Sequence, residues 1–148
     1  MLLVNFRLKK SLVGIVALCV VSFVVLGVLF STVKTNPKGS DTLDRLAYLS
    51  KLGYSIDDGS EIETQIKIPK DFSEIYVEYN DTQKDAGFNL TEYSGQDATM
   101  YTYSINNYKD FKGVYANLIV VKDRIVGGDI SSIENGGFTL PLVEINKQ

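Results

Sequence analysis

The sequence predicts an α+β protein: an N-terminal transmembrane helix followed by a small domain in which one or two helices pack on a largely antiparallel sheet. Three observations support this prediction. A charge-free apolar segment lies near the N-terminus, helical and strand-like periodicities alternate after it, and two apolar strands are separated by a turn too short for a parallel connection. A chain of 148 residues has room for one such domain.

The apolar segment runs from Leu12 to Phe30 and contains 19 residues without a charge. As a helix it would extend about 28 Å, close to the roughly 30 Å of a bilayer's hydrocarbon layer. Its composition suits a transmembrane helix or a signal peptide. No pair of small residues follows at the spacing that signal peptidase requires, and bulky Leu18 precedes Cys19, the single cysteine. We therefore expect an uncleaved anchor that contacts the lipid bilayer through residues 11–31.

The flanking charges predict the orientation of this anchor. Three basic residues precede the apolar segment, and a long domain that follows such a segment is translocated with little regard to its own charge. We expect a single-pass protein of the cell membrane with its N-terminus in the cytoplasm. The predicted parts are a cytoplasmic tip over residues 1–10, a transmembrane helix over 11–31, a linker over 32–40 and an extracytoplasmic α+β domain over 41–148.

The domain begins with a predicted helix and a predicted strand. Apolar residues recur at helical spacing after Asp41 or Thr42, either of which can cap the helix, and Gly53 suits the left-handed position after its last turn. The segment 61–68 alternates strictly and ends before a proline. We expect one face of this strand to be buried, and the residues on that face are Ile62, Thr64, Ile66 and Ile68.

A second helix is predicted over residues 71–86. Asp71 and Glu74 have the spacing of a capping box, and Gly87 can end the helix. The residues at helical spacing include Phe72, Ile75, Tyr76, Tyr79, Gln83 and Ala86. We expect this helix to be the main element that packs on the sheet.

Three further strands are predicted in the second half of the domain. Residues 98–105 alternate, and the segments 114–121 and 124–130 flank a two-residue turn and predict a β-hairpin. The hairpin strands are apolar on both faces, so both faces of the sheet need a cover. We expect the C-terminal segment, with Phe138, Leu140 and Leu142, to supply part of it as an irregular return.

Gly127-Gly128-Asp129 matches a motif of the nucleotide cyclases that make cyclic dinucleotides. In those enzymes the motif continues with a glutamate that supplies a second acid, whereas Ile130 follows here and only 19 residues remain after Asp129. We therefore expect the two glycines to form a β-bulge or to allow another segment to approach the strand closely.

Composition excludes several functions. The chain has no histidine and a single cysteine, which excludes Cys/His zinc sites and nucleophiles activated by histidine. After the apolar segment, 12 basic residues stand against 18 acidic ones, a net charge of −6 that disfavours nucleic acid as a partner. We predict no cofactor, no metal site and no catalytic residue.

Nine tyrosines and no tryptophan occur in the chain, most of them between positions 76 and 115. Tyrosine suits half-exposed sites, with the ring inside and the hydroxyl at the rim. We favour tyrosines that complete a small core. The alternative is a face that binds a glycan or a peptide, with Asp129 as a further polar contact, and its aromatic residues would be Tyr93, Tyr101, Tyr103 and Tyr108.

The spacing of several residues resembles a domain family of unknown function that is found in small membrane-anchored proteins of Firmicutes. The resemblance covers about residues 46–142. It implies a surface-tethered bacterial domain and transfers no catalytic role. The matching residues are Tyr79, Asn80, Gln83, Gly87, Phe88, Leu90, Tyr93, Gly95, Tyr101, Tyr103, Ala116, Asn117, Gly127, Gly128 and Asp129.

Together these features predict a membrane-anchored extracytoplasmic domain that acts as a non-catalytic interaction or sensing module of the cell envelope. Its partner would be an envelope protein, a peptide or a glycan. The alternative is an envelope hydrolase that acts on glycan with carboxylates alone, in which Asp129 is paired with Glu134 or Asp123.

Overall fold

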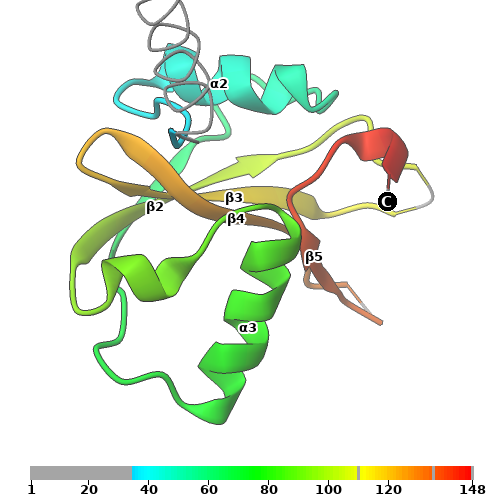
Figure 1. Ribbon diagram of the computed structural model, residues 1–148. Coiled ribbons are helices and arrows are strands. Elements are labelled where there is room, and N and C mark those ends of the chain that lie inside the picture. Colours follow the sequence, from blue (N-terminus) through cyan, green and yellow to red (C-terminus); the bar gives the residue numbers. More distant parts are fainter. Residues whose placement is uncertain (1–34, 110, 135, 148) are drawn as a thin grey trace, which may run out of the picture. The chain divides into compact units, whose positions relative to one another are not determined.

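The computed structural model describes residues 35–109, 111–134 and 136–147 (Figure 1). The chain divides into two compact units, of which the second begins at Asn36. The predicted cytoplasmic tip and transmembrane helix lie outside the described residues. Within the described ranges, none of the helices has the length and apolar character needed to cross a bilayer.

The described residues confirm the predicted class of the domain. Five strands form one antiparallel sheet in the order β1-β2-β3-β4-β5, and two α-helices pack against it. The elements in chain order are α2 (Thr42–Lys51), β1 (Ile62–Lys67), α3 (Glu74–Asp85), the 3-10 helix η1 (Leu90–Tyr93), β2 (Asp97–Ser104), β3 (Val114–Val121), β4 (Arg124–Ser132), β5 (Thr139–Pro141) and the 3-10 helix η2 (Ile145–Lys147).

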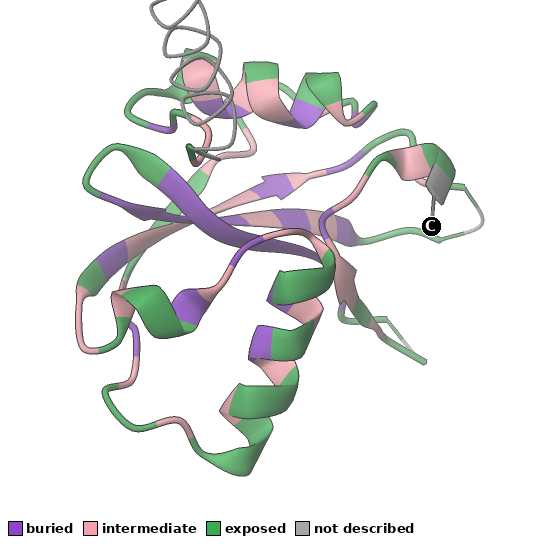
Figure 2. Cartoon of the chain, viewed as in Figure 1, coloured by how far each residue is buried: buried purple, intermediate pink, exposed green. Residues whose placement is uncertain are grey.

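Both faces of the sheet are covered by the chain itself. Helix α2 lies over one face, while α3 and η1 lie over the other (Figure 1). On the α2 side, Leu49 packs in a cluster with Leu118 and with Leu142 of the C-terminal segment. On the α3 side, Leu90 packs with Val126. The β3–β4 hairpin between these clusters is the most continuously buried part of the sheet (Figure 2).

The helix termini confirm one predicted cap and correct another. The Asp41 side chain accepts a hydrogen bond from the backbone N–H of Asp44 (2.8 Å) and caps α2 as predicted. Helix α3 is capped by Ser73 and not by Asp71. The predicted apolar stripe of this helix is wrong at Ile75, which is 78% exposed because it points away from the sheet.

The hairpin agrees with the sequence prediction, and its bulge lies one residue before the predicted glycines. Lys122 and Asp123 both have positive φ angles (46° and 65°), as a two-residue turn that matches the strand twist requires. The register between β3 and β4 shifts between Ile119 and Val120, so the extra residue is Val126, next to the glycines, and the two glycines themselves stay in register with β3. The hairpin therefore bends just before the two glycines of β4.

Strand β1 is much more exposed than predicted. Five of its six residues are exposed, and Ile62 retains 59% of its accessible surface. The cause is position: β1 is an edge strand, whereas α3 contacts β4 and β5 at the other side of the sheet. Of the four residues predicted on the buried face, only Ile68, just beyond the end of the strand, is fully buried.

Residues 36–40, within the predicted linker, are bonded to the domain. The backbone N–H of Gly39 donates to the Asp123 carbonyl (3.0 Å), and the N–H of Ile125 donates to the Pro37 carbonyl (2.9 Å). A Cβ atom on Gly39 would lie 2.7 Å from the Ile125 side chain, so the close approach depends on glycine. The segment thus lies along the start of β4. At the other end of the same strand, the C-terminal return forms β5, a short strand that was expected to be irregular.

Candidate functional site

Asp129 of β4 is the most buried carboxylate that the structure describes, with 4% of its surface exposed. Both of its oxygens accept hydrogen bonds. The Tyr79 hydroxyl donates to Oδ2 (2.7 Å), and the Asn117 side-chain amide donates to Oδ1 (2.7 Å). Strand β4 and helix α3 therefore hold the carboxylate between them.

A row of polar side chains continues from Asp129 across the sheet. The Thr102 hydroxyl of β2 donates to Oδ1 of Asn117 on β3 (2.8 Å), and the Asn117 amide also donates to the Ser131 hydroxyl (3.0 Å). Thr102, Asn117 and Asp129 are direct neighbours in the strand register. These bonds fix the Asn117 amide so that its donor faces the carboxylate.

Gln83 lies one helical turn after Tyr79 and is fully buried. Its Oε1 accepts a hydrogen bond from the backbone N–H of Gly128 (2.7 Å), whereas its Nε2 has no hydrogen-bond partner among the described residues. A Cβ atom on Gly127 would lie 2.9 Å from Oε1 of Gln83, so the glycine leaves room for the amide close to the strand. Gly127 therefore makes room for Gln83 of α3 and Leu90 of η1 on one face of the sheet, while Gly128 makes room for Leu142 on the other.

Burial raises the pKa of the Asp129 carboxyl, and the hydrogen bonds from Tyr79 and Asn117 offset only part of that shift. Burial and the adjacent carboxylate raise the pKa of Tyr79, which therefore remains a protonated donor. None of the ion pairs within the described residues involves Asp129. The site is a desolvated carboxyl that is held by neutral donors.

The structure does not bring a second carboxylate to Asp129. Asp123 is exposed at the hairpin turn, six positions away along the strand, which is more than about 15 Å at 3.3 Å per residue. Glu134 is exposed beyond the end of β4. Paired carboxylates of glycosidases lie about 5–9.5 Å apart. The geometry of Asp129 with Asp123 is therefore unlike that of such a pair.

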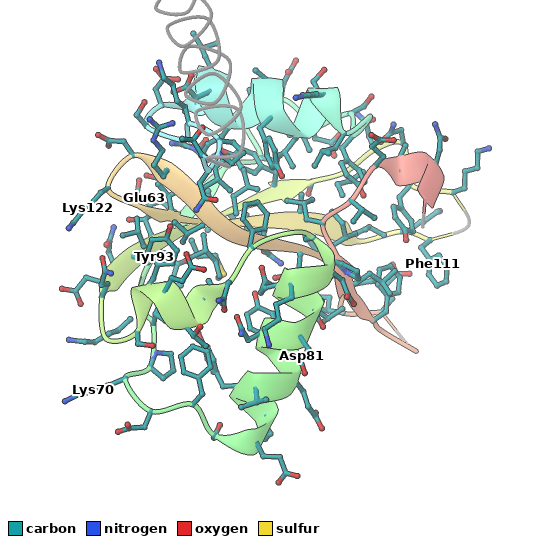
Figure 3. The ribbon with its side chains drawn as sticks, viewed as in Figure 1. Glu63, Lys70, Asp81, Tyr93, Phe111 and Lys122 are labelled. Carbon is teal, nitrogen blue, oxygen red and sulfur yellow. The ribbon has the colours of Figure 1, made fainter. Side chains whose placement is uncertain are left out.

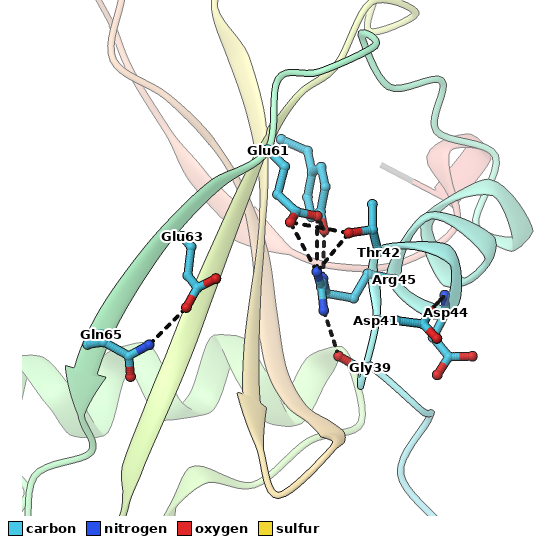
Figure 4. A network of polar contacts seen from close by, with 9 residues as sticks. Gly39, Asp41, Thr42, Asp44, Arg45, Glu61, Glu63 and Gln65 are labelled. Carbon is cyan, nitrogen blue, oxygen red and sulfur yellow. Dashed lines mark hydrogen bonds and ion pairs between the residues drawn. The ribbon is translucent and has the colours of Figure 1, made fainter.

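A second polar cluster lies on the α2 side of the sheet, around Arg45 (Figure 4). Arg45 is 3% exposed although it was not expected in the core. Its guanidinium donates to both oxygens of Glu61 (3.1 Å each) and to the Tyr103 hydroxyl (2.7 Å), and Tyr103 in turn donates to Glu61. It also donates to the Gly39 carbonyl (2.9 Å), so this cluster ties α2 to the residue before β1, to β2 and to segment 36–40.

Electrostatics stabilise the charged form of this second cluster. Burial by itself would raise the pKa of Glu61, but the hydrogen bonds from Tyr103 and Arg45 lower it below its usual value. The Arg45 guanidinium also lies over the Tyr101 ring, 3.6 Å from its centroid, in cation–π geometry. The cluster is therefore an ion pair between Arg45 and Glu61, with a cation–π contact between Arg45 and Tyr101.

A groove of about 230 Å³ lies beside this cluster. It is bordered by segment 36–40, by β1 and β2, and by the tip of the hairpin. Its lining residues include Gln65, Thr99, Tyr101, Lys122 and Asp123. The groove thus combines an aromatic surface with amide, hydroxyl and charged groups of both signs.

The four tyrosines predicted as a possible binding face do not share one face. Tyr103 is buried, and Tyr101 and Tyr108 pack against the same α2-side cluster. Tyr93 packs on the α3 side, where its hydroxyl accepts a hydrogen bond from Asn36 (2.8 Å). Tyr108 stacks on Phe138 beside Phe111, far from Tyr93 in Figure 3. The four rings therefore do not lie together on one face of the sheet, and of the four only Tyr101 lines the groove.

Comparison with known proteins gives a family but no function. Residues 48–130 match the model of a family described as a domain of unknown function (DUF4830). The match covers more than half of the chain. The chain belongs to the DUF4830 family. No curated protein and no solved structure matches it. The predicted resemblance to a family of unknown function is thus confirmed.

The DUF4830 match contains Asp129 with Tyr79, Thr102 and Asn117, whereas Ser131 follows its last residue and Arg45 precedes its first. Sequence reasoning selected Asp129 through the adjacent glycines but missed its partners. The two glycines were the available signal, since they indicated that another element would approach β4. Arg45 gave no signal, because a single arginine in an amphipathic helix usually lies in solvent.

Proposed function

We propose that this chain is a single-pass membrane protein whose DUF4830 domain works outside the cytoplasm as a non-catalytic interaction module of the cell envelope. Its partner is an envelope protein, a peptide or a glycan that binds in the groove beside Tyr101. One observation carries the proposal: segment 36–40, which joins the domain to the apolar segment, forms one wall of that groove.

The short connection supports a domain held close to a membrane. The apolar segment ends at Phe30, and Asn36 already accepts a hydrogen bond from Arg124 through its backbone carbonyl (3.1 Å). Six extended residues span at most about 21 Å. A ligand in the groove would therefore be held near the bilayer surface, as suits an envelope component.

The state of the buried carboxylate supports a binding function over hydrolysis. Both oxygens of Asp129 accept hydrogen bonds from protein side chains, one of which is the Tyr79 hydroxyl of α3. An acid/base catalyst has to reach the proton that it transfers. In contrast, the groove is lined by exposed or half-buried polar residues and by no buried carboxylate, which suits recognition of a polar chain.

Site-specific photo-crosslinking tests the proposal. A photoreactive amino acid replaces Lys122, which extends from the hairpin tip at the rim of the groove (Figure 3). The matched control replaces Ile75, which is 78% exposed on α3. We expect an adduct with an envelope component from position 122 and none from position 75. Equal labelling from both positions, or no adduct from position 122, would contradict binding in the groove.

A further inference from the structure

Strand β1 offers an open edge whose hydrogen-bonding groups can be assigned. Ile68 directs its backbone N–H and carbonyl toward the β2 side, where they bond to Gln96 and Gly95 (3.0 Å each). In an antiparallel pair, successive residues alternate in the direction of these groups. Glu63, Gln65 and Lys67 therefore direct theirs outward. Figure 4 shows Glu63 and Gln65 on this outermost strand.

We infer that β1 pairs antiparallel with β1 of a second copy of this chain, centred on Gln65, so that the two sheets become one. With Gln65 opposite its own copy, Glu63 of each chain lies opposite Lys67 of the other. Opposite charges in direct cross-strand positions stabilise such a pair. All three side chains are exposed and lie on one face of β1. Glu63 accepts a hydrogen bond from Gln65 (3.0 Å), and Lys67 pairs with the exposed Asp97 (3.6 Å); both are surface contacts weak enough for a cross-strand partner to replace.

The neighbouring registers are less favourable. A pairing centred on Glu63 places two glutamates opposite each other, which is destabilising. A pairing centred on Thr64 places Lys67 opposite Glu61, but the Glu61 carboxylate is already bound by Arg45 and Tyr103. Among these registers, only the one centred on Gln65 places Glu63 and Lys67 opposite each other while it pairs outward backbone groups with each other.

The symmetry of this pairing is compatible with two chains in one membrane. The two-fold axis of an antiparallel pair is perpendicular to the sheet, so both α2 helices lie on the same side of the joined sheet. A six-residue strand buries less than the roughly 1,600 Å² of a standard stable interface. Shared anchoring raises the effective concentration and offsets this deficit, so the inference rests on the proposed membrane anchor.

Disulfide formation in isolated membranes tests the register. Full-length protein carries Cys19→Ser, which removes the single native cysteine, together with Gln65→Cys. The paired Cα atoms would be about 5.5 Å apart, within the range of a disulfide. The control is Glu63→Cys in the same background, since residues 63 of the two copies would be about 14 Å apart. We expect oxidation to give a disulfide-linked dimer at least tenfold more efficiently with Gln65→Cys than with Glu63→Cys.

Charge reversal separates pairing from chance collision. In the Gln65→Cys protein, adding Lys67→Glu is expected to reduce the dimer at least fivefold, and adding Glu63→Lys as well is expected to restore it. Membrane-bound protein that forms no dimer, or that crosslinks equally from positions 63 and 65, overturns the pairing alone. Protein absent from the membrane fraction overturns the proposed anchor and the pairing with it.

Discussion

The two buried polar clusters lie on opposite faces of the same sheet and differ in charge balance. On the α2 side, Arg45 and Glu61 form an ion pair supported by Tyr103. On the α3 side, Asp129 is held only by the neutral donors of Tyr79 and Asn117. In the first cluster the ion pair stabilises the charged form of Glu61. In the second, burial disfavours the charged form of Asp129, and the hydrogen bonds offset this only in part.

Acid is therefore expected to affect the two clusters in opposite directions. The pKa of Glu61 is lowered by folding, so its contribution to stability is present above its unfolded value of about 4.3 and is lost as the pH falls through the folded value. The pKa of Asp129 is raised by burial. Its contribution is present below the unfolded value of about 3.9 and is lost as the pH rises through the raised folded value.

The largest effect is expected from deleting residues 138–148, which contribute to both sides of the sheet. Leu142, 1% exposed, covers the α2-side cluster, and β5 pairs with the part of β4 that carries Asp129. Burial of each large apolar side chain contributes about 1.5–3 kcal/mol, so we expect a loss of several kcal/mol. Urea unfolding of fragment 36–148 with and without the deletion measures it. An unchanged midpoint would mean that this face is open and available to a partner.

Arg45→Ala is expected to lower the free energy of unfolding by about 3 kcal/mol, because it leaves Glu61 and Tyr103 without their buried partner. The matched control is Lys84→Ala, which removes the exposed ion pair with Asp81 and should cost less than about 0.5 kcal/mol. Equal effects in urea unfolding would show that the Arg45 cluster contributes no more than a surface pair.

Gly128→Ala is expected to cost about 2–3 kcal/mol, because the new Cβ would lie 2.7 Å from the backbone oxygen of Asn117, which cannot move aside without disturbing the sheet. Gly127→Ala should cost less. Its nearest contacts, at 2.9 Å, are the ends of the Gln83 and Leu90 side chains. Thermal unfolding of both variants compares them, and the reverse order would show that β4 is not fixed by its contact with β3.

The smallest effects are expected from Glu61→Gln and Asp129→Asn, at about 1 kcal/mol each, and their signs separate the two clusters. Between pH 3 and 7, Glu61→Gln should weaken the loss of stability in acid. Asp129→Asn should instead remove a stabilisation that acid provides, while the Tyr79 hydroxyl turns to accept a hydrogen bond from the new amide. Urea unfolding at several pH values measures both. Parallel pH profiles would contradict the contrast between the clusters.

The sequence predicted the elements whose local pattern is strong. The alternation in β2, the apolar runs of β3 and β4, the two-residue turn and the Asp41 cap all depend on neighbouring residues, and all are confirmed. The Gly-Gly pair is a local pattern too, and it predicted the close packing of other segments on β4.

What the sequence could not predict depends on contacts between distant segments. The exposure of Ile62 follows from the place of β1 at the sheet edge, which its own alternation does not reveal. The burial of Arg45 depends on Glu61 and Tyr103, which lie 16 and 58 positions away. The partners of Asp129 come from α3 and β3, so a list of candidate residues could include Asp129 without its environment.

The central claim, that a membrane anchor displays this domain outside the cytoplasm, is tested most directly by adding protease to intact spheroplasts that carry the full-length chain with a C-terminal epitope. The account predicts loss of the epitope while a cytoplasmic marker protein remains intact. Complete protection of the epitope, with digestion only after the membrane is permeabilised, would contradict the claim and place the domain on the cytoplasmic side.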